Sequence, residues 1–206
     1  MTASQTPGDV TVDVVFPLDG QTLPRDHAQA LQQALCAQLP WLGTETLAGV
    51  QPIKLVPGGD EPALLSRRAR LLLRVGARRM DELMALAGLD LSVDGHRLRL
   101  GAPHKRELQP HATLYAYKVA ADSADEVAFM ATVTRELDTL AIGGERVCGK
   151  RQRMVISGRV LDTFSLMLHA LPEEQSLRLQ RSGLGPHRLL GCGIFVPHKS
   201  AAAVGS

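Results

Sequence analysis

His27 lies in the amphipathic stretch "LPRDHAQALQQAL" (residues 23–35), in the first turns of a predicted helix, and is the histidine best placed to do chemistry. An imidazole has an unperturbed pKa of about 6.5, so it can accept a proton near neutral pH. The amino-terminal end of a helix favours the neutral ring, which is the form that a general base needs. His27 is also in helical register with Leu31 and Leu35, as a buried core histidine would be. Spacing alone leaves both roles open.

A glycine-rich segment, "GLGPHRLLGCGIFVPHK" (residues 183–199), is the second candidate for function. It contains two Gly-x-Gly pairs: Gly183, Gly185, Gly191 and Gly193. Each glycine costs about 0.5–1 kcal/mol in regular structure, so four of them indicate positive φ angles or a close approach of the backbone. The backbone N–H groups of such a turn can cradle phosphate oxygens, and Arg188 adds a charged donor. A simple connector is the alternative.

Positive charge is concentrated in the later part of the chain. Residues 1–62 contain two basic and seven acidic residues, a net charge of −5, and the rest contains 21 basic and 14 acidic residues, a net charge of +7. The basic residues cluster in segments 66–79, 96–106 and 146–159, and around Arg178, Arg181 and Arg188. One such cluster is usually a solvated surface, but several together favour a polyanionic partner.

Several classes of protein are excluded by composition. No stretch approaches the roughly 20 apolar residues of a membrane span. The first ten residues lack the basic and apolar regions of a signal peptide. The cysteines (Cys36, Cys148 and Cys192) lie far apart, without metal-ligand spacing. These features predict reduced thiols in a cytoplasmic protein, with no membrane association and no bound metal or other cofactor.

The predicted elements follow the order βαββαβ twice. The first set is a strand at 10–18, a helix at 23–39 that starts at Pro24, strands at 49–57 and 69–75, a helix at 80–88 and an extended segment at 89–101. The second set is a strand at 112–121, a helix at 123–142 capped by Ser123 and Glu126, a hairpin at 151–171, a helix at 172–183 and a strand at 193–199.

This order predicts an α+β protein with two tandem ferredoxin-like domains packed side by side. Residues 1–101 form the first domain, which carries His27, and residues 112–199 form the second, which carries the glycine-rich segment. Residues 102–111 are predicted to be a linker and residues 200–206 a disordered tail.

Tandem ferredoxin-like halves with a G-φ-G-x5-G-φ-G loop before the last strand resemble the repeat-associated RNA-binding superfamily of CRISPR systems. Within it, the chain is similar to the Cas-six family, and most to its Myxococcus-type subgroup. The resemblance covers residues 12–198 and is carried by "VDVVFPLDGQTLPRDHAQALQQAL", "LPWL", "SRRARLLLRV" and "SLRLQRSGLGPHRLLGCGIFVPHK".

The resemblance implies an endoribonuclease that cuts precursor CRISPR RNA within its repeats. His27 stands where the family has its catalytic histidine. The implied mechanism needs no metal: a 2′-OH attacks the adjacent phosphate and leaves a 2′,3′-cyclic phosphate and a 5′-OH. The implied partners are CRISPR repeat RNA, as precursor and as mature guide, and other Cas effector subunits.

RNA-binding residues are expected in the basic and glycine-rich segments. They are Lys105, Lys150, Arg151, Arg153, Gly183, Gly185, His187, Arg188, Gly191 and Gly193. Lys150, Arg151 and Arg188 are also the candidates for a cation that stabilises the negative charge developing on the reacting phosphate.

Two alternatives remain open. The first is a non-catalytic RNA-binding subunit of a CRISPR effector complex, because a fold does not by itself define an activity. The second is a two-histidine phosphoesterase, since "HAT" at His111 and "HKS" at His198 both fit the short pattern HxT/S.

Aromatic residues are scarce, with four Phe, two Tyr and one Trp. Sheets that read single-stranded RNA stack bases on aromatic side chains, and no clustered aromatic motif is present. The sequence therefore predicts that a repeat hairpin is recognised through backbone charge and shape. Tyr115 and Tyr117 share one strand face, and are predicted either to belong to the core or to orient the substrate.

Overall fold

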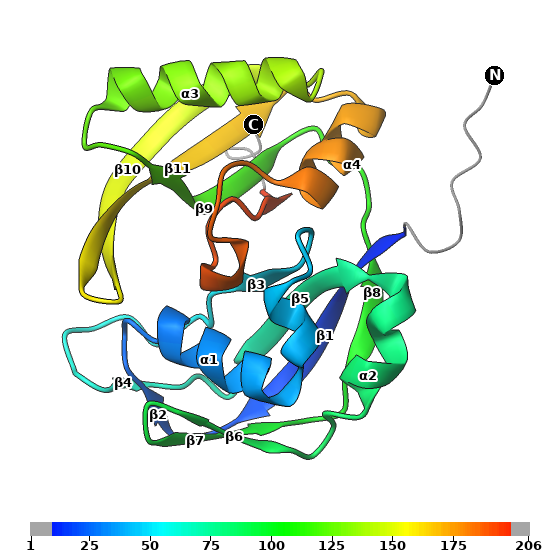
Figure 1. Ribbon diagram of the computed structural model, residues 1–206, viewed down its shortest axis with the longest axis vertical. Helices are drawn as coiled ribbons and strands as arrows, with labels where there is room; N and C mark the ends of the chain where they lie inside the picture. Colours follow the sequence, from blue (N-terminus) through cyan, green and yellow to red (C-terminus); the bar gives the residue numbers. More distant parts are fainter. Residues whose placement is uncertain (1–9, 199–206) are drawn as a thin grey trace, which may run out of the picture. The chain divides into compact units, whose positions relative to one another are not determined.

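The computed structural model describes residues 10–198 of the 206-residue chain. It divides into two compact units, with the boundary between Glu107 and Leu108. Each unit contains helices and a mainly antiparallel sheet (Figure 1). The predicted tail at residues 200–206 lies outside the described residues.

The first unit is built around β1 (Thr11–Asp19), the central strand of its sheet. The other elements are β2 (Thr22–Leu23), α1 (Ala28–Gln38), β3 (Gly49–Gln51), β4 (Ala63–Leu64), β5 (Arg70–Gly76), α2 (Met80–Met84), β6 (Asp90–Val93), β7 (His96–Leu100) and β8 (His104–Glu107). The sheet order is β3-β5-β1-β7-β6, and β8 also pairs with β1. Because β1 has neighbours on both edges and is buried on both faces, the alternation of its first residues gives way to a continuous apolar run at 14–18.

The second unit contains β9 (Leu114–Ala121), α3 (Glu126–Thr139), β10 (Glu145–Ile156), β11 (Arg159–His169), α4 (Glu173–Ser182) and β12 (Val196–Pro197). Its sheet order is β10-β11-β9-β12. With helices after the first and third strands, this is a ferredoxin-like arrangement. The main strands and helices of the first unit follow the same scheme, so the predicted α+β class with tandem ferredoxin-like folds is confirmed.

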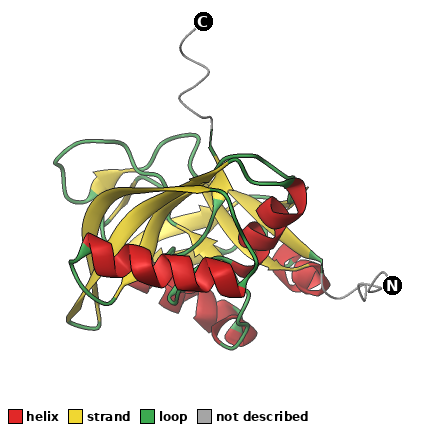
Figure 2. Ribbon diagram, turned by 90° about the horizontal axis from the view of Figure 1, so that it is seen from above, coloured by secondary structure: helices red, strands yellow, loops and turns green. Residues whose placement is uncertain are grey.

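The core of the second unit lies between α3 and one face of the sheet (Figure 2). Phe129, Val133 and Leu137 recur along the buried side of α3. The ring of Phe129 stacks on that of Phe164 from β11, with 4.7 Å between centroids. The core of the second unit therefore lies on the α3 side of the sheet.

Two helix starts differ from the prediction. The first helix begins at Ala28 rather than at residue 23, because Leu23 belongs to β2 and pairs with Ala63 of β4. The third helix is capped by Asp125 rather than Ser123: the Asp125 carboxylate accepts hydrogen bonds from the N–H groups of Val127 and Ala128, at 2.8 and 3.4 Å.

The predicted linker at residues 102–111 is wrong for part of its length. His104–Glu107 form β8, which pairs with β1 in continuation of β7. The side chains of β8 are all polar and exposed, so the segment has the composition expected of a linker. Its backbone nevertheless pairs with β1 along the part of the strand that β7 does not reach. The hydrophobic pattern of the sequence does not predict this pairing.

Among residues 10–198, no helix is both long enough and apolar enough to cross a lipid bilayer.

Candidate functional site

His27 lies immediately before α1, at the N-cap position. Its backbone is near-helical, with φ −87° and ψ −3°, and its carbonyl accepts the first helical hydrogen bond from the Leu31 N–H at 2.8 Å. The side chain does not cap the helix. The imidazole is instead held by two backbone groups from other segments.

These two contacts fix the tautomer of the ring. Nδ1 lies 2.9 Å from the carbonyl oxygen of Pro24, and Nε2 lies 3.3 Å from the backbone nitrogen of Ile53. A carbonyl oxygen can only accept and a backbone N–H can only donate. The proton therefore sits on Nδ1 and the lone pair on Nε2, which is the neutral form required of a general base.

The same contacts satisfy the side chain as a core residue. His27 is only 5% exposed, and each ring nitrogen has a partner within the first unit. The contact from Ile53 is the longer of the two and lies at the long end of the hydrogen-bond range. A substrate hydroxyl that is to give its proton to Nε2 must replace the Ile53 N–H.

The remaining histidines differ from His27 in exposure and in position. His104, His111, His187 and His198 are exposed, whereas His96 and His169 are partly buried. None of these six directly precedes an α-helix. His27 alone therefore combines burial with a helix start.

The glycine-rich loop crosses itself closely at two of its glycines. Gly183 and Gly193 both have positive φ angles, +64° and +66°. A Cβ atom on Gly193 would collide with the carbonyl oxygen of Leu184, and one on Gly183 with the Gly193 carbonyl and the Arg188 guanidinium. These two positions require glycine because two stretches of backbone pack directly on each other.

The backbone N–H groups of all four loop glycines are used within the second unit. Gly183 and Gly191 donate to carbonyls of the preceding turns, at 2.8 and 3.1 Å. Gly193 donates to the Lys118 carbonyl at 2.7 Å, and Gly185 donates to a carboxylate oxygen of Glu136 at 2.9 Å. The expectation that these N–H groups are free to cradle phosphate is therefore corrected.

Arg188 is also part of the loop's own scaffold. It is 8% exposed, and its guanidinium donates to the carbonyls of Ser182 at 2.6 Å and Arg181 at 3.1 Å. These carbonyls belong to the last turn of α4, where a positive charge also offsets the helix dipole. The structure thus contradicts the prediction that Arg188 offers an open donor to phosphate.

The tip of the loop borders a cavity of about 160 Å³ in the second unit. Its lining includes Asp122 and Glu136 together with Pro186 and His187. Two carboxylates oppose the approach of a phosphate. His187 is exposed at this tip, in a left-handed conformation with φ +67°.

The predicted basic residues lie on two sheet edges. Lys105 is on β8 of the first unit and pairs with Glu107 at 3.2 Å. On β10 of the second unit, Arg151 contacts Asp162 of β11 at 2.8 Å, and Arg153 contacts the same carboxylate at 3.8 Å. Arg153 is the more exposed, at 67% against 36% for Arg151, and the neighbouring Lys150 is also exposed.

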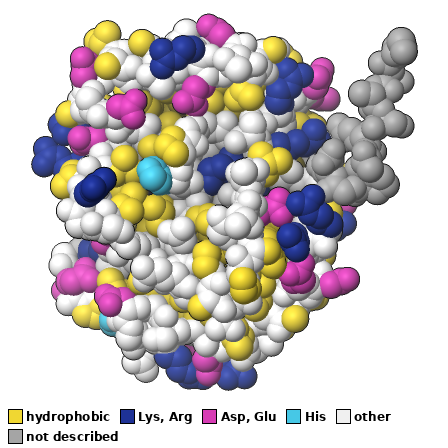
Figure 3. Space-filling model, in the orientation of Figure 1, with side chains coloured by type: hydrophobic (Ala, Val, Ile, Leu, Met, Phe, Trp, Pro, Cys, Tyr) yellow, Lys and Arg dark blue, Asp and Glu magenta, His cyan; other side chains and the backbone are white. Residues whose placement is uncertain are grey.

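Acidic side chains lie among the basic ones. On the face shown in Figure 3, Lys and Arg side chains of the described residues have Asp and Glu side chains near them. The basic segments of the sequence are thus partly neutralised locally, as Asp162 does for Arg151.

The first unit contains a buried ion pair that the sequence did not predict. Asp13 on β1 lies directly between Arg74 of β5 and Arg106 of β8 in strand register. The carboxylate accepts two hydrogen bonds from Arg74, at 2.7 and 3.1 Å, and one from Arg106, at 2.8 Å. Asp13 and Arg74 are almost fully buried, whereas Arg106 is half exposed. In the sequence, this ion pair is indicated only by one charged residue within each of two apolar segments, Asp13 in β1 and Arg74 in β5.

All three cysteines are free thiols. Burial raises the pKa of Cys192 to about 11, so this thiol stays protonated and unreactive near neutral pH. Among residues 10–198, no group of three or more His, Cys, Asp and Glu side chains could hold a metal ion.

Comparison with known proteins identifies the family. The family model "Cas6 Crispr" matches residues 12–200. A protein of Myxococcus xanthus named "CRISPR-associated endonuclease Cas6" is 37% identical over 198 residues, which is 96% of this chain and 86% of that protein. The chain belongs to the Cas6 family.

Solved structures share the Cas6 fold at low sequence identity. A "CRISPR associated protein Cas6" superposes with a TM-score of 0.69 at 10% identity, over 92% of this chain and all of that one. The product of a Cas6-related gene from Pyrococcus furiosus gives 0.60 at 9% identity, over 90% and 98% of the two chains. Thermus thermophilus Cse3, solved with an RNA representing a pre-cleavage complex, gives 0.51 at 17% identity, over 91% and 98%. These likenesses extend over nearly the whole Cas6 chain.

Proposed function

We propose that this Cas6 protein is an endoribonuclease that binds CRISPR repeat RNA and cleaves precursor CRISPR RNA into mature guides. The observation that carries the proposal is the 37% identity over 96% of the chain to a protein named a CRISPR-associated endonuclease. RNA is proposed as the partner, and other Cas subunits as further partners that receive the guide.

The proposed chemistry is an internal transesterification without a metal ion. The ribose 2′-OH attacks the adjacent phosphorus, so that a bond forms between the 2′ oxygen and phosphorus. The bond between phosphorus and the 5′ oxygen of the next nucleotide breaks, and that oxygen gains a proton. The products are a 2′,3′-cyclic phosphate and a 5′-OH.

His27 is proposed to accept the proton of the 2′-OH at Nε2. Its hydrogen bond to the Pro24 carbonyl supports this role, because it keeps the proton on Nδ1 and the lone pair on Nε2. In the reactive complex the 2′-OH takes the place of the Ile53 N–H as the partner of Nε2.

Chelation should leave the reaction intact. Because the proposed base is an imidazole and the nucleophile belongs to the RNA, cleavage in excess EDTA should proceed within about twofold of the untreated rate, on the order of RT in activation free energy. The product ends should be 2′,3′-cyclic phosphate and 5′-OH by mass spectrometry. Loss of cleavage in EDTA, with recovery on adding Mg²⁺, would reject this mechanism.

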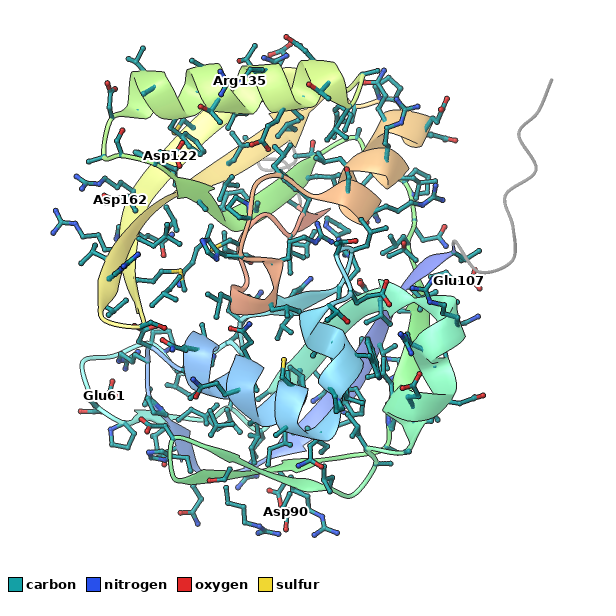
Figure 4. The ribbon with its side chains drawn as sticks, in the orientation of Figure 1. Glu61, Asp90, Glu107, Asp122, Arg135 and Asp162 are labelled. Atoms are coloured by element: carbon teal, nitrogen blue, oxygen red, sulfur yellow. The ribbon has the colours of Figure 1, made fainter. Side chains whose placement is uncertain are left out.

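The β10 arginines should contribute to RNA affinity through salt-dependent contacts. Replacing Arg151 and Arg153 with Glu should weaken binding of a repeat hairpin. It should also reduce the slope of log K against log salt by about one for each phosphate that the variant no longer neutralises. Arg135→Glu is the control, since Arg135 is an exposed residue of α3 (Figure 4). A slope equal to that of the wild type would place the RNA contacts elsewhere.

A non-catalytic RNA-binding subunit is the second candidate function. The observation that favours it is the satisfied state of His27, whose two ring nitrogens already have partners. A single-turnover assay on repeat RNA separates the two, because a binding subunit leaves the RNA intact at saturating protein.

A further inference from the structure

The sheet of the second unit has an unusual irregularity in β9. A register shift leaves Tyr117 and Lys118 together opposite one residue of β11, Ser165. Their outer neighbours, Ala116 and Val119, both belong to the buried core. Because side chains alternate along a strand, Tyr117 and Lys118 both lie on the other face, away from the core.

A second shift on β10 mirrors the first. Between Cys148 and Arg151, two residues again oppose Ser165, namely Gly149 and Lys150. Cys148 packs against the core, and a Cβ on Gly149 would collide with the Ser165 hydroxyl on the opposite face. Arg151 pairs with the core residue Phe164, so its side chain lies on the core side of the sheet. Lys150 precedes Arg151 and therefore lies on the opposite face, as Gly149 does.

The two bulges thus bring two lysines to one surface from either side of β11. Adjacent strands are about 4.8 Å apart, so the backbones at Lys118 and Lys150 are separated by about 10 Å. Lys150 is exposed and Lys118 is half-buried.

Aromatic rings gather on the same face. The rings of Tyr115 and Tyr117 form an edge-to-face pair with 4.9 Å between centroids, and His198 lies 5.2 Å from Tyr115. Tyr117 is 43% exposed and His198 is exposed. Tyr117 is therefore accessible to solvent on this face, unlike the core side chains of β9 on the other face.

We infer that this surface, formed by Tyr115, Tyr117, His198, Lys118 and Lys150, binds an unpaired nucleotide of RNA. The base stacks on the exposed ring of Tyr117, and the flanking phosphates pair with the two lysines. Bases in a duplex are already stacked on one another, so an open aromatic ring selects a single-stranded segment. The inference rests on the proposed function in that RNA is the substrate.

The first test measures binding of a fluorescein-labelled oligouridylate, which has no hairpin. Tyr117→Ala should weaken its binding by about 5- to 150-fold, the range found for losing one base–aromatic stack. Tyr117→Phe keeps the ring and should bind within about twofold of the wild type. Val127→Ala, at a 79% exposed position of α3, is the control for folding and surface change.

The second test separates the lysines from general surface charge. Lys118→Gln and Lys150→Gln should each reduce the slope of log K against log salt by about 0.7, the value for one phosphate contact on a single strand. Arg135→Gln removes one charge from the side of α3 that faces away from the sheet, and should leave the slope unchanged. Photocrosslinking of 4-thiouridine RNA should label the peptide that contains Tyr117.

The outcomes distinguish this inference from the proposed function. If the wild type binds oligouridylate and Tyr117→Ala binds it equally well, the stacking site is rejected while the proposed endoribonuclease stands. If the wild type binds neither oligouridylate nor repeat RNA, the proposed function itself is rejected. Equal affinity of Tyr117→Phe and Tyr117→Ala, both weaker than the wild type, would assign the effect to the hydroxyl and overturn stacking.

Discussion

Replacing His27 with alanine is expected to lower the single-turnover rate of repeat-RNA cleavage by about 10²–10⁴-fold, the usual contribution of a positioned general base. RNA affinity should change little, because a neutral imidazole at the reacting 2′-OH acts mainly in the transition state. The rate, the dissociation constant and the melting temperature should be measured on the same preparation.

His27→Asn is the matched variant for this experiment. Its side-chain amide can still donate to the Pro24 carbonyl, as Nδ1 does in the wild type, but it offers no basic nitrogen. It should therefore be at least as stable as His27→Ala and equally slow. His104→Ala, at an exposed position of β8, should cleave at the wild-type rate.

A core role for His27 predicts a different pattern. Activity would then fall only as far as the folded fraction falls. His27→Asn would recover much of the folded fraction and much of the cleavage activity. A folded, tightly binding His27→Ala that cuts near the wild-type rate would remove His27 from the mechanism. A 2′-deoxy substitution at the scissile nucleotide should abolish cleavage by every variant, since the nucleophile is then absent.

Asp13→Ala is expected to destabilise the first unit by about 3–5 kcal/mol. The substitution leaves the buried guanidinium of Arg74 without the carboxylate that accepts two of its hydrogen bonds. Trp41 is the single tryptophan of the chain and lies in the first unit, so its fluorescence reports the unfolding of this unit in urea.

The two arginines on Asp13 offer an internal control. Arg106→Ala removes a partner that is half exposed, and should cost less than about 1 kcal/mol. Replacing Asp13 with Val and Arg74 with Met in one variant should recover most of the stability, because apolar residues of similar volume can take the place of a buried ion pair. Equal destabilisation by Arg106→Ala and Asp13→Ala would show that burial does not govern this cluster.

Local sequence patterns determined the order of the elements. Alternation along "VTVDVVFPL" and the four-residue spacing of Leu31 and Leu35 depend only on neighbours along the chain, so the strand and helix they predict are both found. The βαββαβ order found twice, and the motifs around His27 and the glycine-rich loop, were enough to identify the fold and the family. Local spacing also places His27 near the start of a helix, although that helix begins at Ala28 rather than at residue 23.

The tertiary structure decided where the polar groups find their partners. Glu136 accepts a hydrogen bond from the Gly185 N–H, and the guanidinium of Arg188 donates to carbonyls at the end of α4, whereas the sequence predicted that both donors contact phosphate. The sequence does not show whether the donors of a glycine or an arginine face solvent or another segment. Only the folded structure shows which acceptor each donor has.

Strand pairing was the other property beyond the reach of local patterns. The polar segment His104–Glu107 becomes a strand because β1 has an open edge, and Lys118 and Lys150 reach one face because two bulges meet opposite Ser165. Each of these depends on register between segments that are distant in sequence, and one inserted residue reverses the face of those that follow. The sequence by itself therefore determined the elements, the family and the candidate base, whereas only the folded chain decided which cations and rings share a surface.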